Sequence, residues 1–262
     1  MVMDTEIFRQ QMKQKGWVIF DQVIQPELVE RMRIGLEFCY QQCRNIQVKN
    51  GIADNNEFTV HHLIGQEDSF LEYLDVTPIH DYVRIYFSGP FTLNSFGGAI
   101  NTSLSRSYAH NIHRDVRSYS PVLPIMLNTL VMLDDFTADN GATWMLSGSH
   151  KQSSKPSKQE FSEKAEQAIG KCGSVLMFDS NVWHAGGENK TRKVRRSVTP
   201  MYSKPFVKQQ FDYPRALGYE NQLRLSPLMQ QIIGYNARTP ATLDEWYQPP
   251  EKRMYKRDQE PA

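Results

Sequence analysis

Two histidines and one aspartate are the residues of this sequence whose types and spacing could hold a metal ion. His113 and Asp115 stand two positions apart in HNIHRD, and His184 follows far downstream in NVWHAGG. In a strand, alternate side chains share a face about 7 Å apart, so His113 and Asp115 can point at one ion. Two imidazoles and one carboxylate leave open positions for O2 and a bidentate co-substrate on Fe(II). The three residues therefore predict a non-haem Fe(II) centre.

A basic residue follows the distal histidine by eleven positions. Arg195 stands near the start of a predicted strand, residues 195–203. If that strand pairs antiparallel with a strand at 181–184, the guanidinium can enter the metal cavity. A buried guanidinium is costly unless a carboxylate satisfies it, preferably through two parallel hydrogen bonds. The distal carboxylate of 2-oxoglutarate would do this, so the spacing predicts a site for metal and co-substrate together.

Four segments between residue 16 and about residue 203 resemble a known family in order and spacing. They are GWVIFDQVIQPELVERMR, HNIHRD, LDDFTADNGATWMLSGSH and WHAGGENKTRKVRRSV. They are similar to the Fe(II)- and 2-oxoglutarate-dependent oxygenases of the phytanoyl-CoA dioxygenase type. The resemblance implies that His113, Asp115 and His184 bind Fe(II) and that Arg195 binds the C5 carboxylate of 2-oxoglutarate. It also implies a double-stranded β-helix core, which is a cupin-like jelly roll.

Two further positions are interpreted through the same resemblance. Asn128 matches a strand position that often carries an amide facing the co-substrate, although an amide bonded only to the backbone is an open alternative. Gly186 stands where the family often has a small hydroxyl residue, two positions after the distal histidine. The sequence therefore departs from the family at one expected hydrogen bond to the co-substrate.

Candidate substrate contacts follow from the alternation of side chains between the two faces of a strand. Arg117 and Tyr119 continue the alternation of His113 and Asp115, which places them on the cavity side of a regular strand. His61 and His62 are adjacent, so in a strand only one of them could enter the site, and we take His62 as the candidate. The pocket walls are expected from residues 48–68, 91–119 and 211–219.

The expected reaction follows from the resemblance. A small-molecule metabolite is hydroxylated at an unactivated C–H bond, and 2-oxoglutarate and O2 are consumed with release of succinate and CO2. The presence of Asp115 disfavours halogenation, because halogenases on this scaffold generally lack the carboxylate. Two hypotheses from other classes stay open: a zinc hydrolase that uses the same ligands with a bound water, and a non-catalytic jelly-roll binding protein.

Composition limits the partners. The 262 residues carry 30 basic and 29 acidic side chains, so the charge of +1 gives no nucleic-acid footprint, and a small-molecule partner is expected. The three cysteines suit reduced thiols in a reducing compartment. No signal peptide and no segment of about 20 apolar residues is visible, which predicts a soluble, cytoplasmic protein without a membrane partner. The oligomeric state is not defined by these patterns.

The elements that must position the site are expected in one domain. A helical part covers residues 1 to about 90, the jelly-roll core about 91–205, and a C-terminal extension about 206–262. Helical periodicity and end signals predict helices at 5–15, 26–47, 78–87 and 227–233. An early strand is expected at 17–20, an irregular segment at 48–68 and an exposed insertion at 151–167. The core strands are predicted at 91–96, 99–103, 107–113, 125–133, 142–146, 174–178, 181–184 and 195–203.

Overall fold

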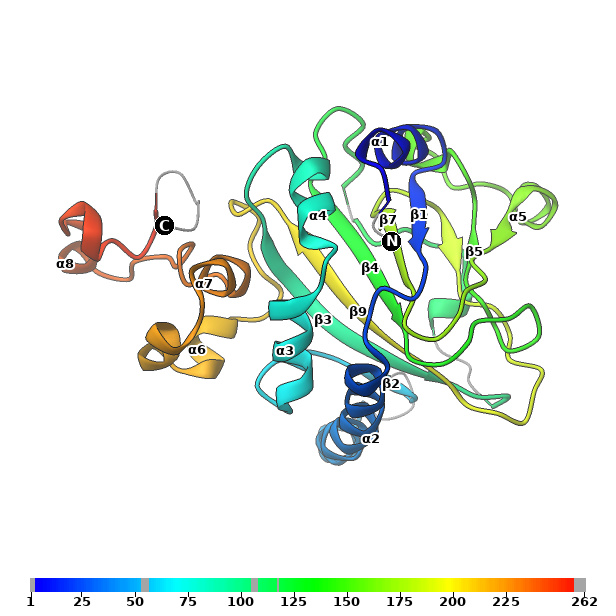
Figure 1. Ribbon diagram of the computed structural model, residues 1–262, viewed down its shortest axis with the longest axis horizontal. Helices are drawn as coiled ribbons and strands as arrows, with labels where there is room; N and C mark the ends of the chain where they lie inside the picture. Colours follow the sequence, from blue (N-terminus) through cyan, green and yellow to red (C-terminus); the bar gives the residue numbers. More distant parts are fainter. Residues whose placement is uncertain (1–2, 53–56, 105–107, 117, 257–262) are drawn as a thin grey trace.

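The strands of the protein form two sheets that face each other, as the jelly-roll prediction requires (Figure 1). The computed structural model describes residues 3–52, 57–104, 108–116 and 118–256. Within them the larger sheet has the order β1-β7-β4-β9-β3-β2 and the smaller sheet the order β6-β5-β8, with antiparallel pairing throughout. The strands are β1 (Trp17–Phe20), β2 (Thr59–Val60), β3 (Thr92–Asn101), β4 (Met126–Met132), β5 (Trp144–Met145), β6 (Glu166–Gln167), β7 (Val175–Asp179), β8 (His184–Ala185) and β9 (Arg195–Ser203).

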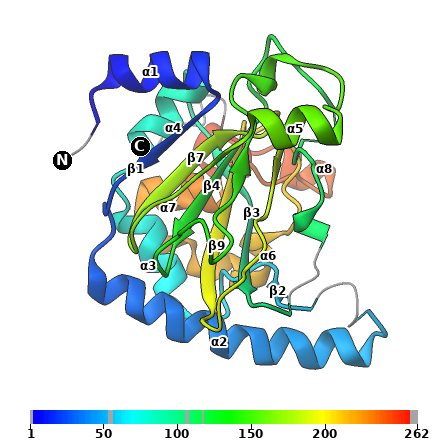
Figure 2. The same ribbon diagram turned by 90° about the vertical axis from the view of Figure 1, so that its right-hand side faces the viewer.

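Four N-terminal helices pack on the outer face of the larger sheet, away from the smaller sheet (Figure 2). They are α1 (Thr5–Gln14), α2 (Pro26–Lys49), α3 (Asp68–Val76) and α4 (His80–Phe87). Helix α2 begins with Pro26 at its first turn, where the missing N–H costs nothing, and buries Leu28, Met32 and Leu36. The predicted helices at 5–15, 26–47 and 78–87 are thereby confirmed.

The sheet separates two environments because side chains alternate along each strand. On β9, Val198 and Tyr202 enter the apolar core beneath the helices. Ser197 and Thr199, one residue out of phase with them, line a cavity on the inner face between the two sheets. A second apolar cluster includes Leu176 of β7 and Phe136, which follows β4.

Strand β3 corrects the prediction of two strands at 91–96 and 99–103. The predicted break between these strands falls at Gly97 and Gly98, but both glycines pair with Thr199 and Val198 in the middle of one strand. A Cβ on Gly98 would lie 2.6 Å from Leu36 Cδ1. Gly98 therefore serves close packing of α2 against the sheet, so that the chain continues straight through it.

Before the C-terminal extension, two of the described helices lie where the sequence predicted none. Helix α3 follows directly on the segment expected to be irregular, and the Glu67 side chain caps it by accepting from Ser69 N–H. Its nine residues are too few for a clear periodic pattern. The predicted insertion at 151–167 contains α5 (Lys158–Lys164), which follows the Ser157 cap, and also strand β6.

The C-terminal extension packs in part on the main core. It contains α6 (Tyr213–Leu217), α7 (Pro227–Ile233) and α8 (Leu243–Trp246). Helix α7, predicted at the same residues, buries Met229 and Ile232 in the core shared with β3 and the N-terminal helices. Helix α8 lies at the far end of the molecule (Figure 1). Among the described residues, no helix has both the length and the apolar character needed to cross a membrane.

Candidate metal and co-substrate site

His113, Asp115 and His184 come together at one end of the inner cavity. Their potential ligand atoms all lie within 4.8 Å of one another. His113 Nε2 is 3.5 Å from Asp115 Oδ1, and His184 Nε2 is 3.6 Å from Asp115 Oδ2. Two imidazole nitrogens and a carboxylate at these separations can share one cation. The donor set therefore fits a divalent first-row metal with open positions on the cavity side.

Backbone contacts, and not a regular strand, hold the first two ligands. His113 and His184 form an isolated bridge, with N–H to carbonyl distances of 3.0 and 2.9 Å. The N–H groups of Asp115 and Val116 both donate to Ser180 O. The predicted strand at 107–113 is wrong: within its described part, residues 108–110 form a 3-10 turn. The segment that carries His113 and Asp115 is thus held by hydrogen bonds to the start of β8 and the loop before it, and not by the pairing of a regular strand.

Both imidazoles are oriented for metal binding by the nitrogen that points away from the cavity. His113 Nδ1 lies 2.7 Å from Asn111 O, and His184 Nδ1 lies 2.9 Å from Val182 O. A carbonyl only accepts, so each Nδ1 carries the hydrogen and each Nε2 keeps its lone pair. Burial lowers the pKa of His184, which favours the neutral ring that a metal requires.

Asn128 supports the carboxylate of Asp115. Its Nδ2 donates to Asp115 Oδ2, and its Oδ1 accepts from Ser180 Oγ at 2.6 Å. The amide lines the cavity and bonds to side chains, so the alternative of backbone-only bonding does not apply. Ser180, which the sequence interpretation missed, thus contacts both Asn128 through its hydroxyl and Asp115 through its carbonyl. No pattern in the sequence marks such a contact across 52 residues.

Arg195 is a buried cation whose hydrogen-bonding capacity is largely unused. Arg195 is 5% exposed, and its Nε and Nη1 have no hydrogen-bond partner within the described part of the chain. Its guanidinium carbon lies 4.1 Å from the centre of the Phe136 ring. Burial lowers the pKa of Arg195 to about 10, against a smaller raising effect of Asp134, so the side chain is still charged at neutral pH. A charge left in this state needs an anionic ligand.

The route by which Arg195 reaches the cavity differs from the predicted one. β9 pairs with β3 and β4, whereas β8, which carries His184, pairs with β5 in the smaller sheet. Pairing of 195–203 with 181–184 is therefore wrong. The arginine and the distal histidine come from facing sheets, and both line the same cavity of about 490 Å³.

Further residues border this cavity. Ser197 lies two positions after Arg195 on the same face of β9, a parity that the sequence could have revealed. Thr143 is a further hydroxyl residue of the lining. Gly186, which stands where the family often has a small hydroxyl residue, also lines the cavity. Its N–H donates to Ala109 O at 2.7 Å, so a backbone hydrogen bond fixes this position.

The three predicted substrate contacts lie in different places. His62 lines the cavity. His61 lines it too, contrary to the expectation that only one of the pair could, because His62 has a left-handed backbone (φ 58°) that breaks the alternation. Tyr119 is not among the lining residues, and its ring packs against the Arg114 guanidinium at 5.0 Å. Arg117 lies outside the described residues.

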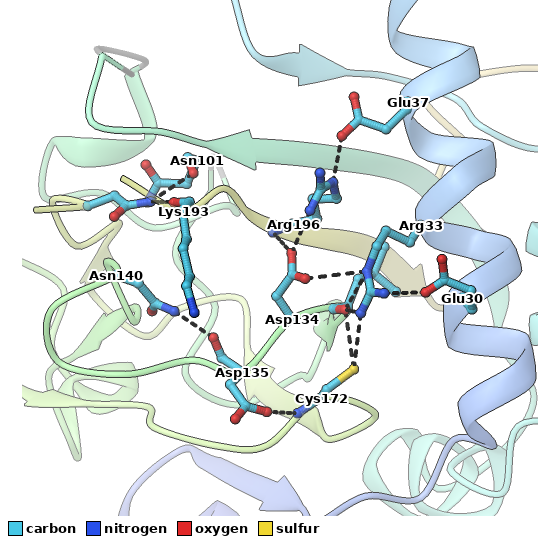
Figure 3. A network of polar contacts seen from close by, with 12 residues as sticks. Glu30, Arg33, Glu37, Asn101, Asp134, Asp135, Asn140, Cys172, Lys193 and Arg196 are labelled. Carbon is cyan, nitrogen blue, oxygen red and sulfur yellow. Dashed lines mark hydrogen bonds and ion pairs between the residues drawn. The ribbon is translucent and has the colours of Figure 1, made fainter. Parts of the chain in front are cut away.

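On the outer face of the same sheet, charged groups pair with one another (Figure 3). Arg196 Nε donates to Glu37 of α2 at 2.6 Å, and its N–H and Nη1 donate to Asp134 at 2.7 and 3.2 Å. Arg33 of α2 joins Asp134 and also pairs with Glu30. Burial acts to lower the pKa of Arg196, but Glu37 and Asp134 together raise it. This network fastens α2 to β9 next to Arg195.

Comparison with known proteins agrees with this geometry. The family model for phytanoyl-CoA dioxygenase (PhyH) matches residues 86–197, which include all three ligand candidates and Arg195. The uncharacterized protein Mb1539 of Mycobacterium bovis is 32% identical over 220 residues, which are 80% of each chain. The Fe(II)/2-oxoglutarate-dependent dioxygenase nvfF of Aspergillus novofumigatus is 23% identical over 249 residues, 89% of this chain and 83% of that one.

A solved structure shows the same fold. HygX from Streptomyces hygroscopicus, crystallised with nickel and 2-oxoglutarate bound, has a TM-score of 0.61 at 16% identity. The match covers 81% of this chain and 91% of that one. Facing sheets around a His/Asp/His site define a non-haem Fe(II)- and 2-oxoglutarate-dependent dioxygenase. The chain belongs to the phytanoyl-CoA dioxygenase (PhyH) family, and with that the zinc hydrolase and the non-catalytic binding protein are set aside.

Proposed function

We propose that His113, Asp115 and His184 hold the Fe(II) ion and that Arg195 binds the distal carboxylate of 2-oxoglutarate. The enzyme then hydroxylates an unactivated C–H bond of a small-molecule metabolite, with release of succinate and CO2. The observation that carries this proposal is the buried guanidinium of Arg195, which has no partner at Nε and Nη1 among the described residues and lines the same cavity as the ligand set. A dicarboxylate that also chelates the metal would satisfy both features with one molecule.

The protein's own residues orient and enclose the reactants. Bound Fe(II), together with 2-oxoglutarate and O2, supplies the oxidising power, which the side chains alone do not have. The carbonyls of Asn111 and Val182 fix the two imidazole rings. Asn128 fixes the carboxylate plane of Asp115, and the buried rings of Phe136 and Phe178 restrict water around the charged groups.

Hydroxylation, rather than halogenation, is supported by Asp115. Its carboxylate lies within reach of both histidines and would fill the coordination position that a halide needs. We also propose His62 as a substrate contact, since it lines the cavity. Tyr119 and Arg117 remain predicted contacts, and Tyr119 would have to leave Arg114 to take that role.

The organisation of the chain is part of the proposal. We propose one catalytic domain over residues 1–262, because the core cluster combines residues of the N-terminal helices, the larger sheet and α7. A small-molecule substrate and no nucleic-acid partner fit the near balance of charge. A cytoplasmic location is supported by the three cysteines, which are free thiols.

Anaerobic titration with Fe(II) and 2-oxoglutarate tests the central assignment. A weak visible charge-transfer band should appear in the wild-type protein when both are present. A screen for compounds that stimulate succinate formation then identifies the substrate class. Absence of the band in a protein that binds Fe(II) would remove 2-oxoglutarate from the site.

A further inference from the structure

The C-terminal extension contributes side chains to one wall of the cavity. Gln210 lines the cavity directly, next to His61 and His62 from the segment that follows β2. Phe211 and Tyr213 come directly after it, and Tyr213 opens helix α6, where the Asp212 side chain caps the first turn. This part of the wall is therefore built by two segments that lie about 150 residues apart in the chain.

Phe211 and Tyr213 enclose the His62 ring. Phe211 stacks on it with ring centres 4.6 Å apart and planes 15° from parallel. Tyr213 meets it edge-on at 6.0 Å, and the two aromatic rings contact each other at 5.3 Å. His62 also has a positive φ of 58°, which residues other than glycine rarely adopt. Such a backbone persists when the surroundings fix it, so the ring position is built into the fold.

One hydrogen bond determines how His62 can act. His62 Nδ1 lies 3.1 Å from the Tyr213 hydroxyl, and Tyr213 is fully buried. A buried hydroxyl must place its hydrogen on an acceptor, because leaving it unpaired is costly. Nδ1 of His62 is the acceptor that the described contacts provide. The imidazole then carries its own hydrogen on Nε2.

The Phe96 backbone supports this direction of the hydrogen bond. Phe96 O accepts from Leu63 N–H, so the N–H of Phe96 also faces the segment that contains His62. Burial raises the pKa of Tyr213, and the Phe96 backbone acts in the opposite direction, as an N–H that faces the hydroxyl oxygen does. A donor N–H on the side of the hydroxyl oxygen favours a hydroxyl hydrogen that is directed to His62.

We propose that Phe211 and Tyr213 act as a clamp that holds His62 as the Nε2–H tautomer, a hydrogen-bond donor to the substrate. This inference rests on the proposed function, since it concerns the substrate of the same cavity. Burial, and to a smaller extent His61, lower the pKa of His62, so the ring is neutral at pH 7. Nε2 of His62 has no protein partner among the described residues and is available in the cavity wall.

The clamp defines a chemical class of substrate. A neutral N–H donor suits an uncharged oxygen acceptor, such as a ketone, an ether or an alcohol. Among the described lining residues, Arg195 is the sole lysine or arginine, and the proposed function commits it to 2-oxoglutarate. Among the described lining residues, a second carboxylate would find no other lysine or arginine, and an ammonium group would find only Asp115, which is committed to the metal. We therefore expect an uncharged, oxygen-bearing small molecule.

The tautomer is read directly by nitrogen NMR of the full chain without metal. The protein has seven histidines, so 15N-histidine labelling gives few signals, and His62→Gln assigns the one of interest. We expect the Nε2–H form in the wild-type protein and a mixture of forms in Tyr213→Phe. Tyr202→Phe is the matched control, because Tyr202 contacts His80 in the core and should alter only that signal. An Nδ1–H form of His62 in the wild type would overturn the clamp.

Probe molecules test the substrate class separately. The panel contains small alcohols and ketones, each matched by the carboxylate and the amine of the same carbon skeleton. Binding is measured by saturation-transfer NMR to protein loaded with Zn(II) and 2-oxoglutarate. We expect uncharged members to bind, with roughly three- to tenfold weaker affinity in Tyr213→Phe. Preference for the carboxylates or amines, or no binding by any uncharged member, would overturn the class. Failure of 2-oxoglutarate to bind would instead contradict the proposed function.

Discussion

Arg195 and Arg196 are neighbours on β9, yet they point to opposite faces of one sheet. Arg196 faces α2 and uses its donors on Glu37 and Asp134. Arg195 faces the cavity and is buried against Phe136, and two of its nitrogens have no partner in the part of the chain that the structure describes. The partly exposed Arg196 is thus paired, whereas the buried Arg195 has Nε and Nη1 without a partner among the described residues, where the metal ligand candidates gather. Charges on the outer face pair with one another, whereas the proposed function assigns those on the inner face to the metal ion and 2-oxoglutarate.

The largest effect is expected at the metal end of the inner face. Asp115→Ala should lower both Fe(II) binding and substrate-triggered succinate release by at least about 100-fold, because it removes one of three ligands. Fe(II) titration and succinate assays measure both. Asp135→Ala is the control, since that carboxylate pairs with Lys171 on the surface. Undiminished turnover of Asp115→Ala would remove this residue from the metal site.

The two arginines allow a matched test. Arg195→Met should weaken 2-oxoglutarate binding by about 100-fold, since a buried charge pair is lost. The midpoint of thermal unfolding should stay or rise, because an unpaired buried cation disappears. Calorimetric titration of metal-loaded protein and thermal unfolding provide the two readings. A large loss of stability with unchanged 2-oxoglutarate affinity would show that Arg195 is structural.

Arg196→Met should give the opposite result. Removing its charge-assisted hydrogen bonds should lower the free energy of unfolding by about 2–3 kcal/mol, since Asp134 and Glu37 lose their partner. The KM for 2-oxoglutarate should change less than about threefold. Urea unfolding and steady-state kinetics check this, and a strong rise of KM would mean that the outer network positions Arg195.

Asn128 tests whether the carboxylate needs support. Asn128→Ala removes the donor to Asp115 and the acceptor for Ser180. Loss of such a contact to a metal ligand typically weakens metal binding about 10- to 100-fold. We expect this in Fe(II) titrations, whereas Asn140→Ala, in a turn outside the cavity, should bind iron as the wild type does. Equal iron affinity of both variants would contradict the role of Asn128.

A smaller effect concerns His80 on the outer face. Burial, with a contribution from Arg84, lowers the pKa of His80 to about 3. Between about pH 3 and 6.5 the unfolded chain binds a proton that the folded chain does not, so stability falls as pH falls. This one group contributes a slope of at most about 1.4 kcal/mol per pH unit. In urea unfolding, the free energy of unfolding of His80→Gln should fall less steeply with decreasing pH than that of the wild type, by up to this slope. An equal slope in the two proteins would contradict this prediction.

The sequence predicted the candidate site residues better than the strands and backbone contacts that position them. The types and spacing of His113, Asp115, His184 and Arg195 are local features of the chain, and the structure brings all four to one cavity. Helices with a long apolar face were also predictable from periodicity. What failed depended on contacts across the fold. The bridge between His113 and His184 replaced a predicted strand, and the pairing of β9 followed the larger sheet.

The wall of the cavity is a second example of this limit. The sequence suggested His62 as a substrate contact and residues 211–219 as part of the pocket wall, but nothing in it indicated that Tyr213 and Phe211 would contact His62. The hydrogen bond between His62 and Tyr213 spans 151 positions in the chain. Its existence depends on how the C-terminal extension packs on β3, which no periodic pattern in either segment describes.

A crystal structure with Mn(II) and 2-oxoglutarate tests the account most directly. We predict Mn(II) bound by His113 Nε2, His184 Nε2 and the Asp115 carboxylate, with the distal carboxylate of 2-oxoglutarate on Arg195. Arg196 should keep its contacts to Glu37 and Asp134. A metal ion held by other residues, or 2-oxoglutarate bound away from Arg195, would contradict the account.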